Sequence, residues 1–231
     1  MDAYGSPRGD SALLPGNLAL PHLQLVTSEM EPGALVDLVG RAAPHGLDSV
    51  QLRLRGLPAR EVLAVGEALI RVLRPLRIPL LVNDRLDLAL AMDSHGVHLR
   101  ADGLSPHVAV ELWERLHPGN PPILGRSVHS VGEAVEATDV TYLIFGHVFE
   151  TASKQGLPGR GLPSLAHVAR SAGAPVLAIG GITPDRVAQV IGAGAAGVAV
   201  RSYLTKAPDP ARATEALRRA LDAAWHESGS P

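Results

Sequence analysis

The fold of this chain is indicated most compactly by the stretch Val176-Leu177-Ala178-Ile179-Gly180-Gly181-Ile182-Thr183-Pro184. Its leading apolar residues predict a buried strand, and the two glycines predict a turn. Threonine followed by proline is typical of a helix start, since threonine caps free backbone N–H groups and proline suits the first helical position. The stretch therefore predicts a strand, a turn and the beginning of a helix.

The same unit recurs along the chain. The predicted strands are residues 23–27, 49–53, 79–83, 96–99, 123–127, 142–146, 176–179 and 197–200. The predicted helices are a segment entered at Pro32, residues 58–74, 86–92 and 106–116, a segment capped by Ser130, and residues 162–172, 184–191 and 210–225. Eight such units with short apolar strands predict an α/β fold, a closed (β/α)8 TIM barrel of parallel strands. An open doubly wound sheet is the alternative, but no Gly-x-Gly-x-x-Gly turn follows the first predicted strand.

A length of 231 residues fits one domain better than two small ones. We expect the barrel domain to cover residues 21–226. Residues 1–20 are rich in Gly, Pro, Ser and Asp, and we expect them to form a flexible N-terminal tail. Residues 227–231 are expected to form a C-terminal tail.

The composition argues against several classes of partner. The formal net charge is −2, which gives DNA, RNA and anionic membranes no strong electrostatic attraction. No cysteine is present, which excludes disulfides and thiolate metal sites and fits a reducing compartment. No apolar run approaches the roughly 20 residues that span a bilayer, and the N-terminus does not resemble a secretory signal. We therefore expect a cytoplasmic protein that binds neither nucleic acid nor membrane.

Polar side chains gather where the predicted strands end. In TIM barrels the active site lies at the carboxyl ends of the strands, so these residues are the candidates for function. They are Thr27, Gln51, Arg53, Arg55, Asn83, Asp84, Arg85, His98, Ser127, His129, His147, Glu150, Lys154, Gly180, Gly181, Arg201 and Ser202. Most are polar or cationic, which predicts a site for a small, multiply anionic ligand.

A phosphate site is expected after the last two strands. Gly180 and Gly181 allow close backbone approach, and the N–H groups at the following helix start can bind an anion. Ser202 follows the eighth strand, and barrels often bind phosphate between these two loops. A plain glycine turn is the alternative.

Arginines and amides from the second and third units are the expected substrate contacts. Gln51 and Arg53 share one face of their strand by alternation, so both should point into the barrel or its mouth. The role of Asn83 stays open, because either Asn83 or Asp84 could simply cap the next helix. Arg85 would be free to meet a carboxylate.

His147 is the candidate acid–base residue, because the unperturbed pKa of histidine suits proton transfer near neutral pH. It ends an apolar strand, with Glu150 and Lys154 nearby in a long loop that could close over a ligand. Lys154 is unusual in composition, since the chain has two lysines against nineteen arginines. His98 and His129 are weaker alternatives. No pair of histidines has metal-ligand spacing, so no zinc site is expected.

Several motifs together resemble the thiamin phosphate synthase superfamily. They are Gln51-Leu52-Arg53, Asn83-Asp84-Arg85 with Asp87-Leu88-Ala89, Gly96-Val97-His98, Ser127-Val128-His129-Ser130 and Ala178-Ile179-Gly180-Gly181-Ile182. The resemblance covers residues 23–204 and implies a homodimer of TIM barrels.

Within this superfamily the chain resembles the TenI-type thiazole tautomerases. Synthases share a Gly-Pro-Val-Phe-Pro-Thr stretch, whereas this chain reads Gly146-His147-Val148-Phe149-Glu150-Thr151. Synthases usually carry lysine two places after the motif arginine, and here Arg55 stands there. They also place an acidic magnesium ligand just after the fourth strand, where this chain reads Arg100-Ala101-Asp102-Gly103 with Asp102 one residue off register.

The resemblance implies an isomerase of thiamin biosynthesis, without cofactor or metal. It would aromatise 2-(2-carboxy-4-methylthiazol-5(2H)-ylidene)ethyl phosphate to 2-(2-carboxy-4-methylthiazol-5-yl)ethyl phosphate. His147 would transfer the proton. The thiazole phosphate would be bound by Gln51, Arg53, Asn83, Arg85, Ser127 and Lys154, with its phosphate on Gly180, Gly181 and Ser202. Two alternatives stay open: a magnesium-dependent thiamin phosphate synthase, which joins a pyrimidine pyrophosphate to thiazole phosphate, and a non-catalytic regulator that binds thiazole phosphate.

Overall fold

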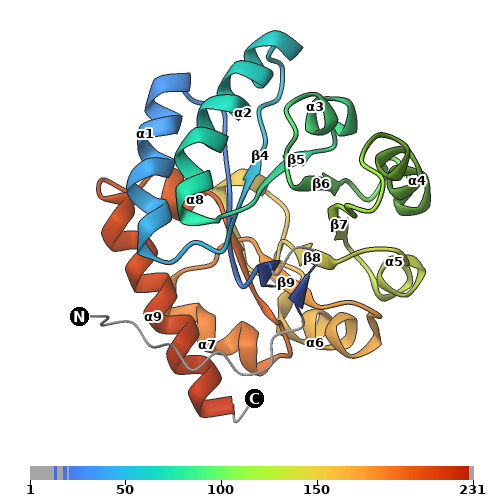
Figure 1. Ribbon diagram of the computed structural model, residues 1–231. Coiled ribbons are helices and arrows are strands. Elements are labelled where there is room, and N and C mark those ends of the chain that lie inside the picture. Colours follow the sequence, from blue (N-terminus) through green and yellow to red (C-terminus); the bar gives the residue numbers. More distant parts are fainter. Residues whose placement is uncertain (1–12, 15–17, 20, 229–231) are drawn as a thin grey trace.

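The computed structural model describes residues 13–14, 18–19 and 21–228 and contains a closed barrel of eight parallel strands in the order β10-β3-β4-β5-β6-β7-β8-β9. Each barrel strand pairs with the one before it and the one after it along the chain, and β10 returns to β3 (Figure 1). The prediction of a (β/α)8 TIM barrel is therefore confirmed.

The observed elements follow the predicted ones to within a few residues. The barrel strands are β3 (Leu23–Val26), β4 (Ser49–Leu52), β5 (Leu80–Asn83), β6 (Gly96–Leu99), β7 (Ile123–Val128), β8 (Tyr142–Gly146), β9 (Val176–Ile179) and β10 (Gly197–Val200). The helices are α1 (Pro32–Ala42), α2 (Ala59–Leu73), α3 (Leu86–Ala91), α4 (Pro106–Leu116), α5 (Val131–Glu136), α6 (Gly161–Ser171), α7 (Pro184–Gly192), α8 (Ser202–Thr205) and α9 (Pro210–Ser228).

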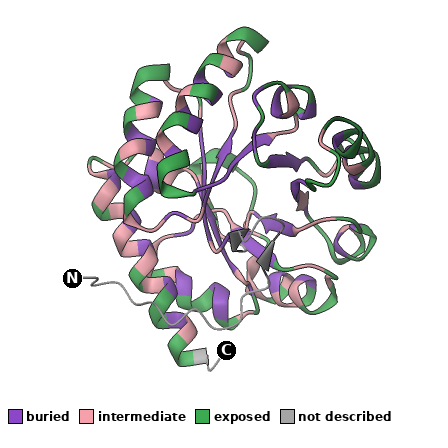
Figure 2. Ribbon diagram, viewed as in Figure 1, coloured by how far each residue is buried: buried purple, intermediate pink, exposed green. Residues whose placement is uncertain are grey.

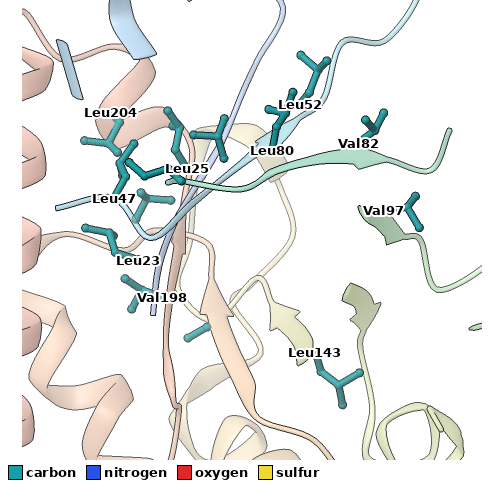
Figure 3. Close-up of a cluster of buried hydrophobic side chains, with 14 of the residues drawn as sticks. Leu23, Leu25, Leu47, Leu52, Leu80, Val82, Val97, Leu143, Val198 and Leu204 are labelled. Atoms are coloured by element: carbon teal, nitrogen blue, oxygen red, sulfur yellow. The ribbon is translucent and has the colours of Figure 1, made fainter. Parts of the chain in front are cut away.

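Strand alternation divides the apolar residues into two layers. On β3, Leu23 and Leu25 point outward into the layer between sheet and helices, whereas Val26 belongs to the cluster inside the barrel. Figure 2 shows the strands almost wholly buried and the helices buried only on the side that faces them. Figure 3 draws part of this outer layer as sticks, including Leu80 on β5 and Val97 on β6, which belong to one cluster of buried apolar residues.

The barrel interior is filled by both apolar and polar side chains. Its apolar cluster comprises Val26, Leu81, Ile123, Tyr142, Ile144, Leu177 and Ala199. Gln24, Ser49, Gln51 and His98 are also buried, at 0–2% exposure. Each of the four makes at least one side-chain hydrogen bond, whereas the buried Oε1 atoms of Gln24 and Gln51 have no partner among the described residues.

Some elements differ from the predicted ones. A two-stranded antiparallel pair, β1 (Leu13–Leu14) with β2 (Leu18–Ala19), lies within the segment expected to be a flexible tail. The rest of that predicted tail, residues 1–12, 15–17 and 20, falls outside the described residues, as do 229–231 at the C-terminus. The short helix α8 was not predicted, and α9, which packs against α1 and α7, continues to Ser228 (Figure 1). None of the helices in the described part of the chain is long and apolar enough to cross a membrane.

Candidate active site at the carboxyl ends of the strands

Three of the predicted substrate residues lie on β4, on β5 and directly after β4. Gln51 on β4 donates its amide N–H to Asn83 Oδ1 at the end of β5, at 3.1 Å. Arg53, two residues beyond Gln51, is held by its backbone N–H on Thr27 Oγ1 at 2.8 Å. The guanidinium of Arg53 lies 3.7 Å from Glu29, with its side chain only 16% exposed. Strand alternation thus places these residues at the mouth of the barrel, which is the end where the strands have their carboxyl termini, as predicted.

Arg53 sits among other positive charges. Burial lowers its pKa, and the neighbouring charges of Arg55, Arg201 and Arg100 lower it further. Partial burial acts to raise the pKa of Glu29, but backbone hydrogen bonds and the charge of Arg53 outweigh burial and lower it. Glu29 is therefore ionised and compensates part of this charge, while the mouth keeps an excess of guanidinium groups that suits an anion.

A buried hydrogen-bond chain supports Ser127 from inside the barrel. Gln24 donates to Tyr142 Oη at 2.9 Å and to Ser49 Oγ at 3.0 Å. His98 lies between Tyr142 Oη, 3.2 Å from Nδ1, and Ser127 Oγ, 2.9 Å from Nε2. Burial lowers the pKa of His98 to about 3 and raises that of Tyr142, so both rings are uncharged at neutral pH.

The tautomer of His98 follows from counting donors. Tyr142 Oη accepts from the Gln24 amide, and His98 Nδ1 is the only acceptor within hydrogen-bond distance of the Tyr142 O–H among the described residues, so this O–H donates to His98 Nδ1. The ring proton must then be on Nε2, which donates to Ser127 Oγ. As a result, the hydroxyl hydrogen of Ser127 is left for an acceptor at the mouth, such as an anionic oxygen.

His147 begins a loop that passes very close to the turn after β9. Its Nε2 donates to the carbonyl oxygen of Leu157 at 3.2 Å. A Cβ on Gly180 would lie 2.3 Å from His147 Cβ, and one on Gly181 would lie 2.7 Å from the carbonyl oxygen of Glu150. Both glycines have positive φ, +102° and +66°. Close packing of the His147 loop therefore requires glycine at both positions, whether or not a phosphate binds there.

The loop after β8 is tied down at both ends. Arg160 donates from Nε to Gly146 O at 3.0 Å and from Nη1 to His129 O at 2.9 Å. At the other side, Ser153 Oγ lies 3.3 Å from Ser202 Oγ, which brings the loop over the end of β10. The sequence did not single out Arg160, because nothing in the sequence except its position at the end of this loop indicates that it would bind Gly146 O and His129 O.

The remaining predicted residues divide into two groups. Lys154 is exposed in this loop and makes no ion pair with a described residue. No described residue accepts a hydrogen bond from the backbone N–H of Gly181 or Ser202, so both amides can donate to an anion.

Arg85 departs from expectation, because Asp87 binds it at both Nε and Nη2, at 2.8 and 2.6 Å. Its guanidinium is therefore engaged and exposed, and it is not free to meet a carboxylate.

The place where the superfamily's synthases hold magnesium has a different composition here. Arg100 Nη2 lies 2.6 Å from Asp102 Oδ2, and Arg100 Nη1 lies 3.7 Å from Asp84 Oδ2. The described residues contain no group of three or more histidine or acidic side chains that could hold a metal ion. Since Arg100 already pairs with both carboxylates, its positive charge stands where a divalent cation would have to bind, and these residues do not fit such a cation.

Comparison with known protein families gives a match over residues 23–204 to the family described as thiamine monophosphate synthase. The thiamine-phosphate synthase of Roseiflexus sp. (strain RS-1) is 44% identical over 197 residues, covering 84% of this chain and 81% of that protein. A thiamine-phosphate synthase of Thermus thermophilus is 39% identical over 191 residues, covering 81% and 89%.

Solved structures agree with this match. A thiamine phosphate pyrophosphorylase from Pyrococcus furiosus superposes with a TM-score of 0.76 at 33% identity, covering 87% of this chain and 96% of that one. A 3-hexulose-6-phosphate synthase superposes with a TM-score of 0.70 at 20% identity, which supports the shared barrel fold alone.

These relatives overturn the predicted activity. The resemblance to thiazole tautomerases depended on the stretch around His147, whereas the relatives that match most of the chain are named synthases. The prediction of an isomerase is therefore wrong, and the proton-transfer role of His147 falls with it.

Proposed function

The chain belongs to the thiamine monophosphate synthase family, and we propose that it is a transferase that joins a pyrimidine diphosphate to a thiazole phosphate to give thiamine phosphate. The observation that carries the proposal is the group of arginines at the mouth, where Arg53 lies within electrostatic reach of Arg55, Arg100 and Arg201. In this transfer the carbon–oxygen bond to the diphosphate breaks as a carbon–nitrogen bond to the thiazole forms. Diphosphate is the leaving group, so positive charge at the mouth stabilises the transition state.

In this proposal the leaving diphosphate binds the side of the mouth formed by the ends of β4, β6 and β7. Arg53 is held in place by its backbone bond to Thr27 and by Glu29, so little side-chain entropy is lost when it binds an anion. Ser127 offers its hydroxyl hydrogen, since His98 already occupies its acceptor side. Lys154 can reach the mouth only from the loop above it and would act as a closing cation.

The phosphate of the thiazole then falls to the opposite side of the mouth. The free N–H groups of Gly181 and Ser202 lie in the loops after β9 and β10, and neutral donors of this kind bind phosphate oxygens. Because Ser153 contacts Ser202, a phosphate bound at Ser202 would also lie next to the loop that carries Lys154. Attack by the thiazole nitrogen uses a lone pair and removes no proton, so this reaction needs no histidine base.

The proposal is tested by incubating the purified chain with both substrates and measuring thiamine phosphate by chromatography with mass detection. We expect product from the wild type and a loss of about 100-fold or more in kcat/KM for Arg53→Ala, which corresponds to roughly 2.7 kcal/mol of transition-state stabilisation. Arg115→Ala is the control, because Arg115 lies on α4 and pairs with Glu111 there. If no thiamine phosphate forms in EDTA and none forms in Mg²⁺, the proposal is refuted.

A further inference from the structure

Three charged side chains meet in the loops that follow β5 and β6. Asp84 follows β5 with φ +61°, and its backbone N–H donates to His98 O at 2.8 Å, which fixes its direction. Its carboxylate accepts from the backbone N–H of Arg100 at 3.4 Å and lies 3.7 Å from the Arg100 guanidinium. Asp102 accepts from Arg100 Nη2 at 2.6 Å. Arg100 therefore bridges the two carboxylates through backbone and side chain.

The turn between Arg100 and Gly103 is shaped to keep this arrangement. Gly103 donates its N–H to the carbonyl oxygen of Arg100 at 3.2 Å. A Cβ at Gly103 would lie 2.5 Å from Asp84 Oδ1, so a side chain at this position would push the carboxylate of Asp84 away. Gly103 thus has no side chain that could bind a metal ion, and it leaves room for the carboxylate of Asp84 to face Arg100.

The guanidinium of Arg100 is held on one side and open on the other. Its Nη2 is hydrogen-bonded to Asp102 and its Nη1 pairs with Asp84 at 3.7 Å, so Nε is the nitrogen that has no acceptor among the described residues. Its charge reaches Arg53, as do the charges of Arg55 and Arg201, and these last two make no ion pair with any described residue. The charges of Arg55, Arg100 and Arg201 therefore all act on Arg53, and Arg55 and Arg201 form no ion pair within 4 Å with a described residue.

We propose that Arg100 takes the place of a divalent cation, so that the chain binds the diphosphate group without a metal ion. A guanidinium that is hydrogen-bonded only through Nη2 keeps further N–H donors and can bind diphosphate oxygens directly, with geometry that suits phosphate. Arg100 also makes the two carboxylates unavailable to a metal ion, since Asp84 and Asp102 are already paired with its guanidinium. The assignment of diphosphate as the anion rests on the proposed function, whereas the replacement of the metal rests on Arg100 itself.

The test is the binding of inorganic pyrophosphate by calorimetry, in EDTA and then in excess Mg²⁺, with constants corrected for the magnesium that free pyrophosphate binds. For the wild type we expect affinities that agree within about twofold in the two buffers. Arg100→Gln should weaken binding about tenfold or more in EDTA, because a charged donor is lost. Arg100→Gly should make binding depend on Mg²⁺, since Asp84 and Asp102 are then free. Arg115→Gln, an exposed arginine on α4, is the matched control and should change neither affinity.

Two results would overturn the inference. One is a wild-type affinity that rises about tenfold or more with Mg²⁺, and the other is unchanged affinity of Arg100→Gln in EDTA. The wild-type comparison decides the question even if a variant does not fold. Failure of the proposed function is distinguishable: pyrophosphate binding in EDTA without any thiamine phosphate formation would leave the inference standing and remove the synthase. Turnover that requires Mg²⁺ would do the reverse.

Discussion

The uncharged, buried His98 makes the stability of the barrel depend on pH in a way that can be calculated. Burial lowers the pKa of His98 from 6.5 to about 3, and its ring lies between Tyr142 and Ser127 with no charged neighbour in hydrogen-bonding contact. The folded pKa is below the unfolded pKa, so as the pH falls the unfolded chain binds the proton first. Stability due to His98 is therefore intact above pH 6.5 and declines from there down to about pH 3.

The size of the effect at pH 5 follows from these two values. At that pH the unfolded histidine is almost fully protonated, whereas the folded ring binds almost no proton. Between pH 7 and pH 5 the linkage relation gives a loss of about 2 kcal/mol in the free energy of unfolding. This loss depends mainly on the pKa of the unfolded chain, because the folded ring stays neutral at both pH values.

The assay is urea denaturation of the wild type and of His98→Gln at pH 7 and at pH 5. Glutamine can still donate to Ser127 but does not titrate, and the other histidines and carboxylates contribute equally to both proteins. We expect the wild type to lose about 2 kcal/mol more than the variant over this interval. Equal losses in the two proteins would refute the reasoning. If His98→Gln does not fold, the ¹⁵N spectrum of the wild type at pH 5 decides, because a protonated His98 ring would equally refute it.

Three further variants test the loops around the mouth. Gly180→Ala adds a Cβ 2.3 Å from His147 Cβ at a φ of +102°, and it should cost about 2–4 kcal/mol in urea denaturation through overpacking and backbone strain. Arg160→Ala removes two hydrogen bonds to carbonyl groups, so we expect a loss of about 1–2 kcal/mol and faster proteolysis within residues 147–160. Arg85→Ala should cost less than about 1 kcal/mol and leave pyrophosphate affinity unchanged within about twofold, since Asp87 holds its exposed guanidinium.

Each of these variants has a control or a contrary outcome. Gly119→Ala has φ +73° but nothing within 4 Å of the added Cβ, so it should show only the backbone cost of about 1 kcal/mol. Equal losses for both glycine variants would mean that packing against His147 is not costly to disturb. Arg170→Ala, an exposed arginine on α6, should leave proteolysis of the loop unchanged. A tenfold loss of pyrophosphate affinity in Arg85→Ala would place that guanidinium in the site after all.

The fold could be predicted from the sequence because it depends on a pattern that every unit repeats. Apolar strands, glycine turns and capped helices, such as the helix that Ser130 caps through Glu133 N–H, are local signals that depend on no distant residue. The residues of the mouth could be predicted for the same reason, since they are the strand ends.

The partners of those mouth residues could not be predicted from the pattern. Arg85 binds Asp87 two residues on, a spacing that carries no standard helical interaction, so it looked available. Arg100 also stands directly after a strand, but whether it would face Asp84 depends on the turn at Gly103. The reason for Gly180 is a contact with a segment more than thirty residues earlier, which only the closed barrel reveals. Side-chain pairing across units thus carries information that strand and helix signals do not.

The loop that began with His147 shows why a short motif misled the assignment of activity. Loops vary more than the strands that they connect, so a likeness confined to one loop weighs less than identity over most of a barrel. Relatives with the Gly-Pro-Val-Phe-Pro-Thr stretch have prolines where this chain has His147 and Glu150, and proline stiffens a loop by fixing φ. In this chain the bond from His147 to Leu157 O and the two bonds from Arg160 hold the same segment. A histidine in place of a proline at this position therefore need not signal a change of reaction, because three hydrogen bonds hold this segment where it packs on Gly180.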